Sequence, residues 1–355
     1  MATPFLSPPG KISADVFDRV IFRALGAPTE HLIVGPQHGV DVGVVRLDER
    51  TVMAITTDPV FVVPEYGWER AAWFAVNILA SDAATSGLRP TFITIDLNLP
   101  RSLSDEDLAT LWTAMHRECT RLGISVIAGH TGRYDGCAYP MVGGATVMAL
   151  GPADAWVTPT MARVGDVVIL TKGPAIEATG LFAATFPNRL SSRYGEERAR
   201  EAEEIFHQMT VVQDALTAVS VGVRDDGVTS LHDATECGVW GGLAEVAQAS
   251  RVGLRIDRDA IPIPPPVAMV CAEFGIDPFS SISEGTLIIT ARPHKAYAVV
   301  GALGESGILA AIIGEVVPSE QGTSYTTVGK TFPLVHPRVD PFWSAFARAF
   351  EEAAR

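Results

Sequence analysis

The sequence has few cysteines and no long apolar run. Four of its 355 residues are cysteines, and none forms a C-x-x-C pair, so neither a zinc site nor a disulfide framework is expected. This cysteine usage is typical of a reduced cytoplasmic protein. No run of about 18 apolar residues marks a membrane span, and the N-terminal segment lacks the apolar core of a signal peptide. We therefore expect a cytoplasmic protein without a membrane segment.

Basic charge is also scarce. The 27 Lys and Arg residues are outnumbered by 41 Asp and Glu residues, and the formal net charge is -14. Nucleic-acid binding requires a basic patch, so we expect no nucleic-acid partner. Acidic side chains would also repel a phosphate-bearing ligand unless a divalent cation lay between them. Any nucleotide chemistry in this protein is therefore expected to use a metal ion.

Three widespread catalytic motifs are missing. The sequence contains no G-x-x-x-x-G-K-[ST] P-loop, no G-x-G-x-x-G dinucleotide fingerprint and no G-x-S-x-G nucleophile elbow. Without these motifs, candidate site residues must be sought among acids and other polar residues at the ends of predicted elements.

Hydrophobic residues make up 47% of the chain, which is ample for two domains of roughly 150–180 residues each. Strand and helix patterns alternate throughout, so a mixed α/β architecture is predicted. The polar, proline-bearing stretch 151–165 is the expected boundary between the halves. Strands are expected at 42–47, 52–55, 91–97, 124–128, 141–150, 167–170, 228–231, 252–256, 286–290 and 308–317. Helices are expected at 15–25, 68–79, from 104 onward, and at 196–221, 242–249, 266–274, 295–303 and 341–355.

Three aspartates lie at the expected ends of separate elements. Asp41 precedes a strand, Asp58 follows the strand 52–55, and Asp82 follows the helix 68–79. Carboxylates at the ends of buried elements are unfavourable unless a cation or a donor network binds them. Any one of them alone is more often a cap or turn residue. The three acids together favour a different interpretation: a site that holds one or two Mg²⁺ ions in contact with phosphate oxygens.

Two further polar residues lie near these acids in the predicted order. Asn77, on an otherwise apolar helix face, is about equally consistent with a ligand contact and with a satisfied buried amide. His130 follows the strand 124–128, where it could be a metal ligand, a phosphate contact or a general base, although a lone histidine there is more often structural.

The second half offers weaker signals. The segment LHDATECG at 231–238 contains Asp233 and Gly238 and leads through Gly241 and Gly242 into a helix. A glycine-rich turn at a helix N-terminus presents N–H groups to an anion. Lys172, after the strand 167–170, could place a cation near a phosphate, or it could be an ordinary loop lysine.

Four segments, in this order, resemble the AIR synthase (PurM-like) superfamily. Its members include the hydrogenase maturation protein HypE, thiamine-monophosphate kinase and selenophosphate synthetase. The similarity runs along nearly the whole chain and is nearest to the HypE-like, AIR synthase-related group. The segments are TTDPVFVVP at 56–64, NILASDAATSGLRP at 77–90, LHDATECG at 231–238 and DPFSSISEGTL at 277–287.

The resemblance implies a PurM-like fold of two α/β domains with ATP in a long cleft. Residues 1–155 would bind ATP and Mg²⁺ and form a homodimer around a β-barrel, residues 156–335 would form a C-terminal α/β sandwich, and residues 336–355 an amphipathic helix. Mg²⁺ would be held by Asp41, Asp58 and Asp82. The expected catalytic residues are Asp58, Asp82 and His130, and the expected cofactor-binding residues are Asp41, Asn77, Lys172, Asp233 and Gly238.

Three departures separate the sequence from HypE. Gly129-His130-Thr131 stands where HypE carries Gly-Asp-Thr, and the acidic turn G-G-D-I-G is replaced by 66–70, with Glu69 as a candidate substitute. HypE acts on its own terminal cysteine, whereas this sequence ends in Glu-Glu-Ala-Ala-Arg and its last cysteine is Cys271. Carbamoyl dehydration on a C-terminal thiol in cis is therefore not expected.

Three functions remain open at this point. The first is an ATP- and Mg²⁺-dependent enzyme of the HypE-like group that activates an oxygen atom of an unidentified small molecule by phosphoryl transfer. The second is a kinase of the thiamine-monophosphate type. The third is a non-catalytic nucleotide-binding factor in hydrogenase or metallocentre maturation.

Overall fold

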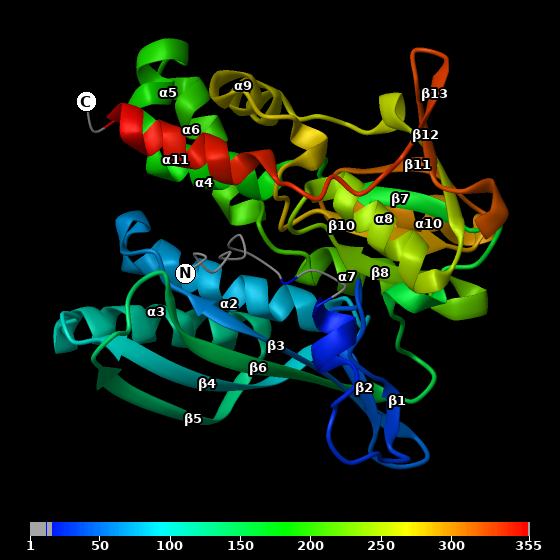
Figure 1. The fold of residues 1–355 in the computed structure, drawn as a ribbon, viewed down its shortest axis with the longest axis horizontal. Coiled ribbons are helices and arrows are strands. Elements are labelled where there is room, and N and C mark those ends of the chain that lie inside the picture. The colour runs from blue at the N-terminus through cyan, green and yellow to red at the C-terminus, as the bar shows by residue number, and fades with distance from the viewer. Residues whose placement is uncertain (1–11, 13–15, 354–355) are drawn as a thin grey trace, which may run out of the picture.

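Two α/β halves lie against each other in the computed structural model, which describes residue 12 and residues 16–353 (Figure 1). Each half contains one mixed sheet, so the predicted α/β class is confirmed. None of the helices in the described part of the chain is both long enough and apolar enough to cross a membrane.

The first half is a sheet of six strands whose order is β1-β2-β3-β6-β4-β5. The strands β4 and β5 are parallel and are joined by the helix α3, as a parallel connection requires. Alternating apolar residues of β4 face α2 and α3 and form part of the core. The elements are β1 (Leu32–Val34), β2 (Gly43–Arg46), β3 (Thr51–Phe61), α2 (Trp68–Ala84), β4 (Pro90–Pro100), α3 (Asp105–Leu122), β5 (Ser125–Tyr134) and β6 (Met141–Pro152).

The second half is a sheet of seven strands whose order is β13-β12-β9-β11-β7-β10-β8. Helix α8 packs on one face of this sheet, and α7 and α10 pack on the other. The strands are β7 (Val167–Thr171), β8 (Val228–Asp233), β9 (Gly253–Asp257), β10 (Leu287–Ala291), β11 (Ala310–Val317), β12 (Ser324–Thr327) and β13 (Lys330–Pro333). The covering helices are α7 (Val212–Ser220), α8 (Gly238–Ser250) and α10 (Pro293–Glu305).

Five helices form a separate layer above α2 in Figure 1. They are α4 (Ile176–Thr185), α5 (Pro187–Tyr194), α6 (Glu196–Glu204), α9 (Pro265–Phe274) and α11 (Pro341–Ala353). Aromatic rings join them: Phe182 of α4 stacks on Phe274 of α9 with ring centroids 3.9 Å apart, and Phe346 of α11 packs against Phe182. The amphipathic C-terminal helix thus covers the aromatic face of this layer.

The described residues also contain short helical turns. They are η1 (Phe17–Ile21), η2 (Pro64–Tyr66), η3 (Pro159–Met161), η4 (Ile205–Gln208), η5 (Arg224–Asp226), η6 (Arg258–Ala260), η7 (Pro278–Ser280) and η8 (Ser319–Gln321). The expected helix 15–25 begins outside the described residues and contains only η1. The expected helical region 196–221 contains α6, η4 and α7, with residues 209–211 between η4 and α7.

One hydrophobic core joins the two halves. It contains Val60 and Ala71 of the first half together with Ala215 and Leu231 of the second, and all four side chains are fully buried. Helix α2 packs against both β3 and α7. The position of α2 is therefore fixed from two sides, and the acid near its C-terminal end is held where the halves meet.

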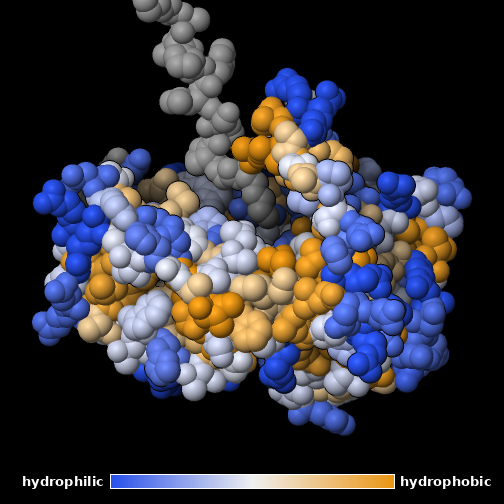
Figure 2. Space-filling model, turned by 90° about the horizontal axis from the view of Figure 1, so that it is seen from below, coloured by the Kyte–Doolittle hydropathy of each residue, from blue (hydrophilic) through white to orange (hydrophobic). Residues whose placement is uncertain are grey.

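The edge strand β5 is exposed along nearly all of its length. Its apolar side chains include Val126 and Ile127, which are 42% and 53% exposed, and Met141, the first residue of β6, is 57% exposed. Figure 2 views the molecule from the side on which β5 lies in Figure 1 and shows hydrophobic surface spread across this face. The first sheet is not closed into a barrel among the described residues.

Candidate functional site

Asp58 and Asp82 meet where β3 passes the C-terminal end of α2. Thr56 of β3 donates a hydrogen bond from Oγ1 to Oδ2 of Asp82, with the two oxygens 3.3 Å apart. Asp58 lies two residues after Thr56 and so projects from the same face of the strand. Asp58 was expected at a strand end, and this is wrong: it lies inside β3, which continues because it pairs with β6 as far as Phe61. Asp82 lies near the end of a helix as expected, in the last turn of α2.

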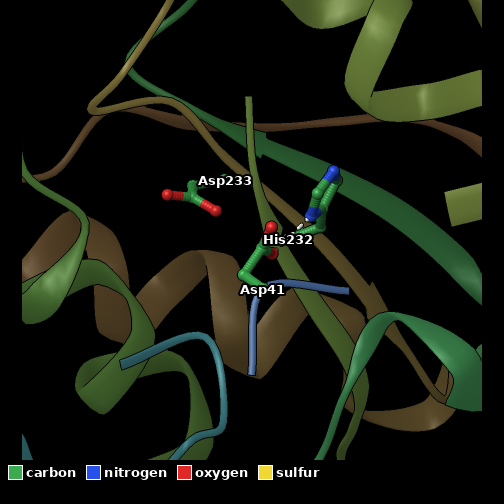
Figure 3. Close-up of side chains that lie close together, drawn as sticks. All are labelled: Asp41, His232 and Asp233. Carbon is green, nitrogen blue, oxygen red and sulfur yellow. Dashed lines mark hydrogen bonds and ion pairs between the residues drawn. The ribbon is translucent and has the colours of Figure 1, made fainter. Parts of the chain in front are cut away.

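Asp41 and Asp233 add carboxylates from the other side of the junction. Asp41 lies in the loop before β2, and Asp233 is the last residue of β8. One ligand atom from each of Asp41, Asp233 and His232 can be chosen so that all three lie within 4.8 Å of one another (Figure 3). Residues from both halves of the chain thus converge on one small region.

The pKa values of these acids are raised because the carboxyl groups are buried close together. Burial, the charges of Asp233, Asp58 and Asp41 and the contact with Asp58 hold the pKa of Asp82 well above its usual range. Burial and the charge of Asp41 raise the pKa of Asp233 to about 7, although the positive charge of His232 opposes the shift. Such crowding is unfavourable without a cation.

His232 is an additional part of the site. Its Nδ1 lies 2.7 Å from Oδ2 of Asp41, its Nε2 lies 2.9 Å from Oε2 of Glu245 in α8, and the side chain is 2% exposed. Burial alone would lower the pKa of His232, but the charges and hydrogen bonds of the two carboxylates raise it well above its usual value. Each ring nitrogen thus faces a carboxylate oxygen, and an imidazole that donates to both carboxylates has no lone pair left for a metal ion.

Glu284 and Glu177 extend the acidic region in the second half. Glu284 is 2% exposed, and burial followed by the charges of Asp233 and Glu177 raises its pKa well above the usual range. Glu177 accepts a hydrogen bond from the backbone N–H of Glu284 at 3.1 Å, and burial is the main cause that raises its pKa to about 8. Sequence reasoning gave neither residue a role, although Glu284 belongs to the quoted segment 277–287.

The donor set fits a divalent cation. Both carboxylate oxygens of the fully buried Asp233, and Oε1 of Glu284, receive no hydrogen bond from the described residues. Buried polar oxygens are normally paired, so these atoms call for a bound cation or donor. Carboxylate oxygens are the ligands that Mg²⁺ prefers. Asp41, Asp58, Asp82 and Asp233 are thus suitable to hold such an ion.

Asn77 makes only structural contacts among the described residues. Its Nδ2 donates to the carbonyl oxygen of Trp73 at 2.9 Å and lies 3.5 Å from Oε2 of Glu118, and its Oδ1 accepts from Nη2 of Arg121 at 3.0 Å. The amide therefore joins α2 to α3. The ligand contact expected for Asn77 stays a prediction that these hydrogen bonds do not favour.

Lys172 is buried in a similar structural network. Its Nζ lies 2.9 Å from Oδ1 of Asp214 in α7, and it donates to the carbonyl oxygens of Thr210 at 2.7 Å and Gly285 at 2.6 Å. The carbonyl oxygen of Gln208 also lies 3.4 Å from Nζ, so four protein oxygens surround the ammonium group. A phosphate contact by Lys172, although still a prediction, would have to break one of these bonds.

Gly238 is the first residue of α8, but its N–H group already has a partner. It donates to the carbonyl oxygen of Thr235 at 3.0 Å, and the N–H of the preceding Cys237 donates to Oδ2 of Asp340 at 2.7 Å. A Cβ at Gly238 would lie 2.3 Å from the carbonyl oxygen of Ser281, which explains the glycine by close packing. The carboxylate of Asp340 thus occupies the turn that was expected to bind an anion.

Gly241 and Gly242 were expected in the turn that leads into this helix, but they lie inside α8. A Cβ at Gly242 would lie 2.7 Å from Cδ1 of Ile288 in β10, so this glycine allows the helix to approach the sheet.

His130 and Glu69 lie outside the acidic region. His130 was expected at a strand end, which is wrong: it lies inside β5, which continues because it pairs with β4 as far as Tyr134. Its Nε2 lies 2.6 Å from the Tyr134 hydroxyl on the exposed edge of the sheet. Glu69, in the first turn of α2, forms an exposed ion pair with Arg117 of α3. A catalytic role for His130 remains a prediction.

Comparisons with known proteins agree with this architecture. The AIR synthase related protein N-terminal domain matches residues 39–162, and the AIR synthase related protein C-terminal domain matches residues 163–326. The carbamoyl dehydratase HypE of Rhizobium leguminosarum bv. viciae is 28% identical over 76% of this chain and 74% of its own length. The carbamoyl dehydratase HypE of Escherichia coli strain K12 is 30% identical over 67% of this chain and 68% of its own length.

Solved structures share the fold. A HypE–HypF complex structure has a TM-score of 0.70 at 21% identity and covers 91% of this chain and 99% of that chain. A HypE structure in complex with ATP has a TM-score of 0.64 at 20% identity and covers 94% of this chain and 97% of that chain. At these identities the likeness establishes the PurM-like fold.

Proposed function

Because the chain belongs to the AIR synthase related protein family, in its HypE-like group, we propose that it is an ATP- and Mg²⁺-dependent enzyme. It would activate an oxygen atom of a small molecule by phosphoryl transfer. The observation that carries the proposal is the convergence of Asp41, Asp58, Asp82 and Asp233, from both halves, on one region, where both oxygens of the buried Asp233 receive no hydrogen bond from the described residues. A structural neighbour that contains ATP and relatives named carbamoyl dehydratase support the same activity class.

The proposed roles follow from this convergence. Asp41, Asp58 and Asp82 would hold Mg²⁺, with Asp233 beside them. When bound, Mg²⁺ neutralises charge on the phosphates of ATP. The four carboxylates place negative charge at fixed positions from rigid elements, so their contribution is to orient the nucleotide phosphates. The substrate lies beyond what the fold defines, because one fold serves many reactions.

The proposed organisation assigns these roles to parts of the chain. Residues 1–155 would bind the nucleotide and the metal, residues 156–335 would complete the cleft, and residues 336–355 contain the helix that covers the aromatic layer. The exposed apolar strand β5 supports a homodimer formed through the first sheet. The four cysteines are unbonded, and three of them are buried, which supports a reducing compartment such as the cytoplasm.

The test compares the wild-type protein with the variant Asp58→Asn/Asp82→Asn. Binding of a non-hydrolysable ATP analogue is measured by calorimetry at 5 and 0.1 mM Mg²⁺, concentrations chosen as roughly saturating and limiting. We expect the double variant to lose Mg²⁺-dependent binding and to keep its circular dichroism spectrum, since charge is removed and not core volume. Asp135→Asn is the matched control, because Asp135 is exposed and forms a surface ion pair with Arg101.

Two results would contradict the proposal. Binding that survives in the double variant would exclude the metal assignment. Absence of both ATP hydrolysis and product over a panel of phosphate acceptors, in wild-type protein that binds the nucleotide, would exclude the enzyme and leave a nucleotide-binding factor.

A further inference from the structure

We propose that His232 is a positioning residue that fixes the loop of Asp41, and with it a metal ligand, onto the second half of the chain. The inference rests on the proposed function, since it concerns how one of the proposed Mg²⁺ ligands is held. It assigns to the imidazole neither metal coordination nor contact with the substrate.

Three elements meet at His232. The residue lies in β8, its Nδ1 contacts Asp41 in the loop before β2, and its Nε2 contacts Glu245 in α8, at 2.7 and 2.9 Å. Asp41 belongs to the first half, whereas His232 and Glu245 belong to the second. With a side-chain exposure of 2%, the imidazole is shielded from the solvent that weakens surface ion pairs. Both ring nitrogens are engaged, so the ring orientation is fixed.

Backbone packing places the same loop on the same helix. Gly39, two residues before Asp41, has a φ of +69°, and a Cβ there would lie 2.9 Å from Cβ of Glu245 and 3.1 Å from its carbonyl oxygen. The loop backbone therefore rests directly on α8 at Glu245. The ionic contact and the packing contact are separate observations, and both join residues 39–41 to the second half.

The consequence concerns the direction of the Asp41 carboxylate. Oδ2 of Asp41 is held by His232, and the adjacent Asp233 comes from the same strand as His232. One imidazole thereby sets the relative position of two carboxylates that lie on different halves of the chain (Figure 3). Partners that orient metal ligands typically change metal affinity by about 10–100-fold when they are removed.

A purely structural role predicts different measurements. A buried ion pair that only stabilises the fold would, when broken, lower the free energy of unfolding without changing the Mg²⁺ requirement of the folded protein. Arg292→Gln provides that reference, because Arg292 pairs at 2.6 Å with the fully buried Asp166 in the second half, which is not one of the proposed ligands.

The experiment uses the full chain with His232→Ala, His232→Gln and Arg292→Gln. Hydrogen–deuterium exchange of residues 39–42 is measured without nucleotide. The Mg²⁺ concentration for half-maximal binding of a non-hydrolysable ATP analogue is then measured by calorimetry. We expect His232→Ala to increase exchange at 39–42 and to raise the half-saturating Mg²⁺ concentration by about 10–100-fold. His232→Gln, which keeps one donor toward Asp41, should show a smaller increase, and Arg292→Gln should change neither quantity.

The two measurements separate the failure of this inference from that of the proposed function. Unchanged exchange at 39–42 in folded His232→Ala would show that His232 does not fix this loop. Increased exchange with an unchanged Mg²⁺ requirement would show that fixing the loop does not position a metal ligand. If the wild-type protein bound no Mg²⁺-nucleotide, the proposed function would fail and the metal part of the inference with it. Increased exchange at 39–42 would still show in that case that His232 fixes the loop of Asp41. If His232→Ala does not fold, His232→Gln alone decides by the same criteria.

Discussion

Replacing Lys172 by methionine distinguishes a structural lysine from a phosphate-binding one. Lys172 is 10% exposed and Asp214 is 3% exposed, and their charged atoms are 2.9 Å apart. Methionine fills similar space but leaves the Asp214 carboxylate buried without its cation. Removing one partner of a buried pair destabilises a protein by about 3–5 kcal/mol. The carbonyl oxygens of Thr210 and Gly285 would also lose their donor.

The free energy of unfolding is measured by urea denaturation followed by tryptophan fluorescence. We expect Lys172→Met to lower it by about 3–5 kcal/mol, and the double variant Lys172→Met/Asp214→Asn to recover at least about 1 kcal/mol, since the unpaired charge is gone. The affinity for the ATP analogue, measured on folded protein at saturating Mg²⁺, should change by less than about threefold, equivalent to about 0.7 kcal/mol.

Two outcomes would refute this reasoning. A loss of stability below about 1 kcal/mol would mean that the buried pair is not the main role of the lysine. A loss of nucleotide affinity of tenfold or more in stable Lys172→Met protein, equivalent to about 1.4 kcal/mol, would restore the phosphate contact predicted from the sequence.

Two further predictions concern Glu177 and Gly238. Burial raises the pKa of Glu177 from its ordinary value of 4.5 to about 8, so folding favours its protonated form. The resulting stabilisation is complete below pH 4.5 and is lost as the pH rises through 8. Glu177→Gln should therefore raise the melting temperature more at pH 9 than at pH 6 in metal-free protein, and an equal rise at both pH values would contradict the shift. Gly238→Ala should destabilise by at least about 1–2 kcal/mol, because its φ is +58° and the added Cβ would lie 2.3 Å from the carbonyl oxygen of Ser281. Gly301→Ala is the control: Gly301 lies in α10 with open space around it, and the change should stabilise by about 0.5–1 kcal/mol in urea denaturation, so equal effects would refute the packing explanation.

Local sequence patterns were sufficient to predict the class of fold. Alternating strands and helices indicated the α/β architecture, and the four quoted segments, in their order, indicated the family. The sequence predicted the ends of the strands less accurately. Asp58 and His130 were expected at strand ends, yet β3 and β5 continue through them because hydrogen bonding to β6 and β4 extends further than the apolar pattern. Pairing with a neighbouring strand is a property of the fold and leaves little trace in one sequence.

The candidate site was predicted only in part for a related reason. Asp41, Asp58, Asp82 and Asp233 were named from the sequence, and the fold brings them together. The role of His232 depends on Asp41 and Glu245, which lie 191 and 13 residues away along the chain. Such partners cannot be paired from a single sequence, although His232 stands next to Asp233 in a quoted segment. The partners of Lys172 were missed for the same reason, because Thr210 and Gly285 lie 38 and 113 residues away.

The core shared by the two halves limits how the protein can move. Separating the halves would expose apolar residues such as Val60 of β3, Ala215 of α7 and Leu231 of β8, each fully buried in the shared core. Each 100 Å² of apolar surface newly exposed to water costs about 2.5 kcal/mol. A hinge opening of the whole molecule is therefore disfavoured, and ligands are expected to enter through rearrangement of loops. For the same reason, neither half is expected to be stable when produced alone, and unfolding should be cooperative across the junction.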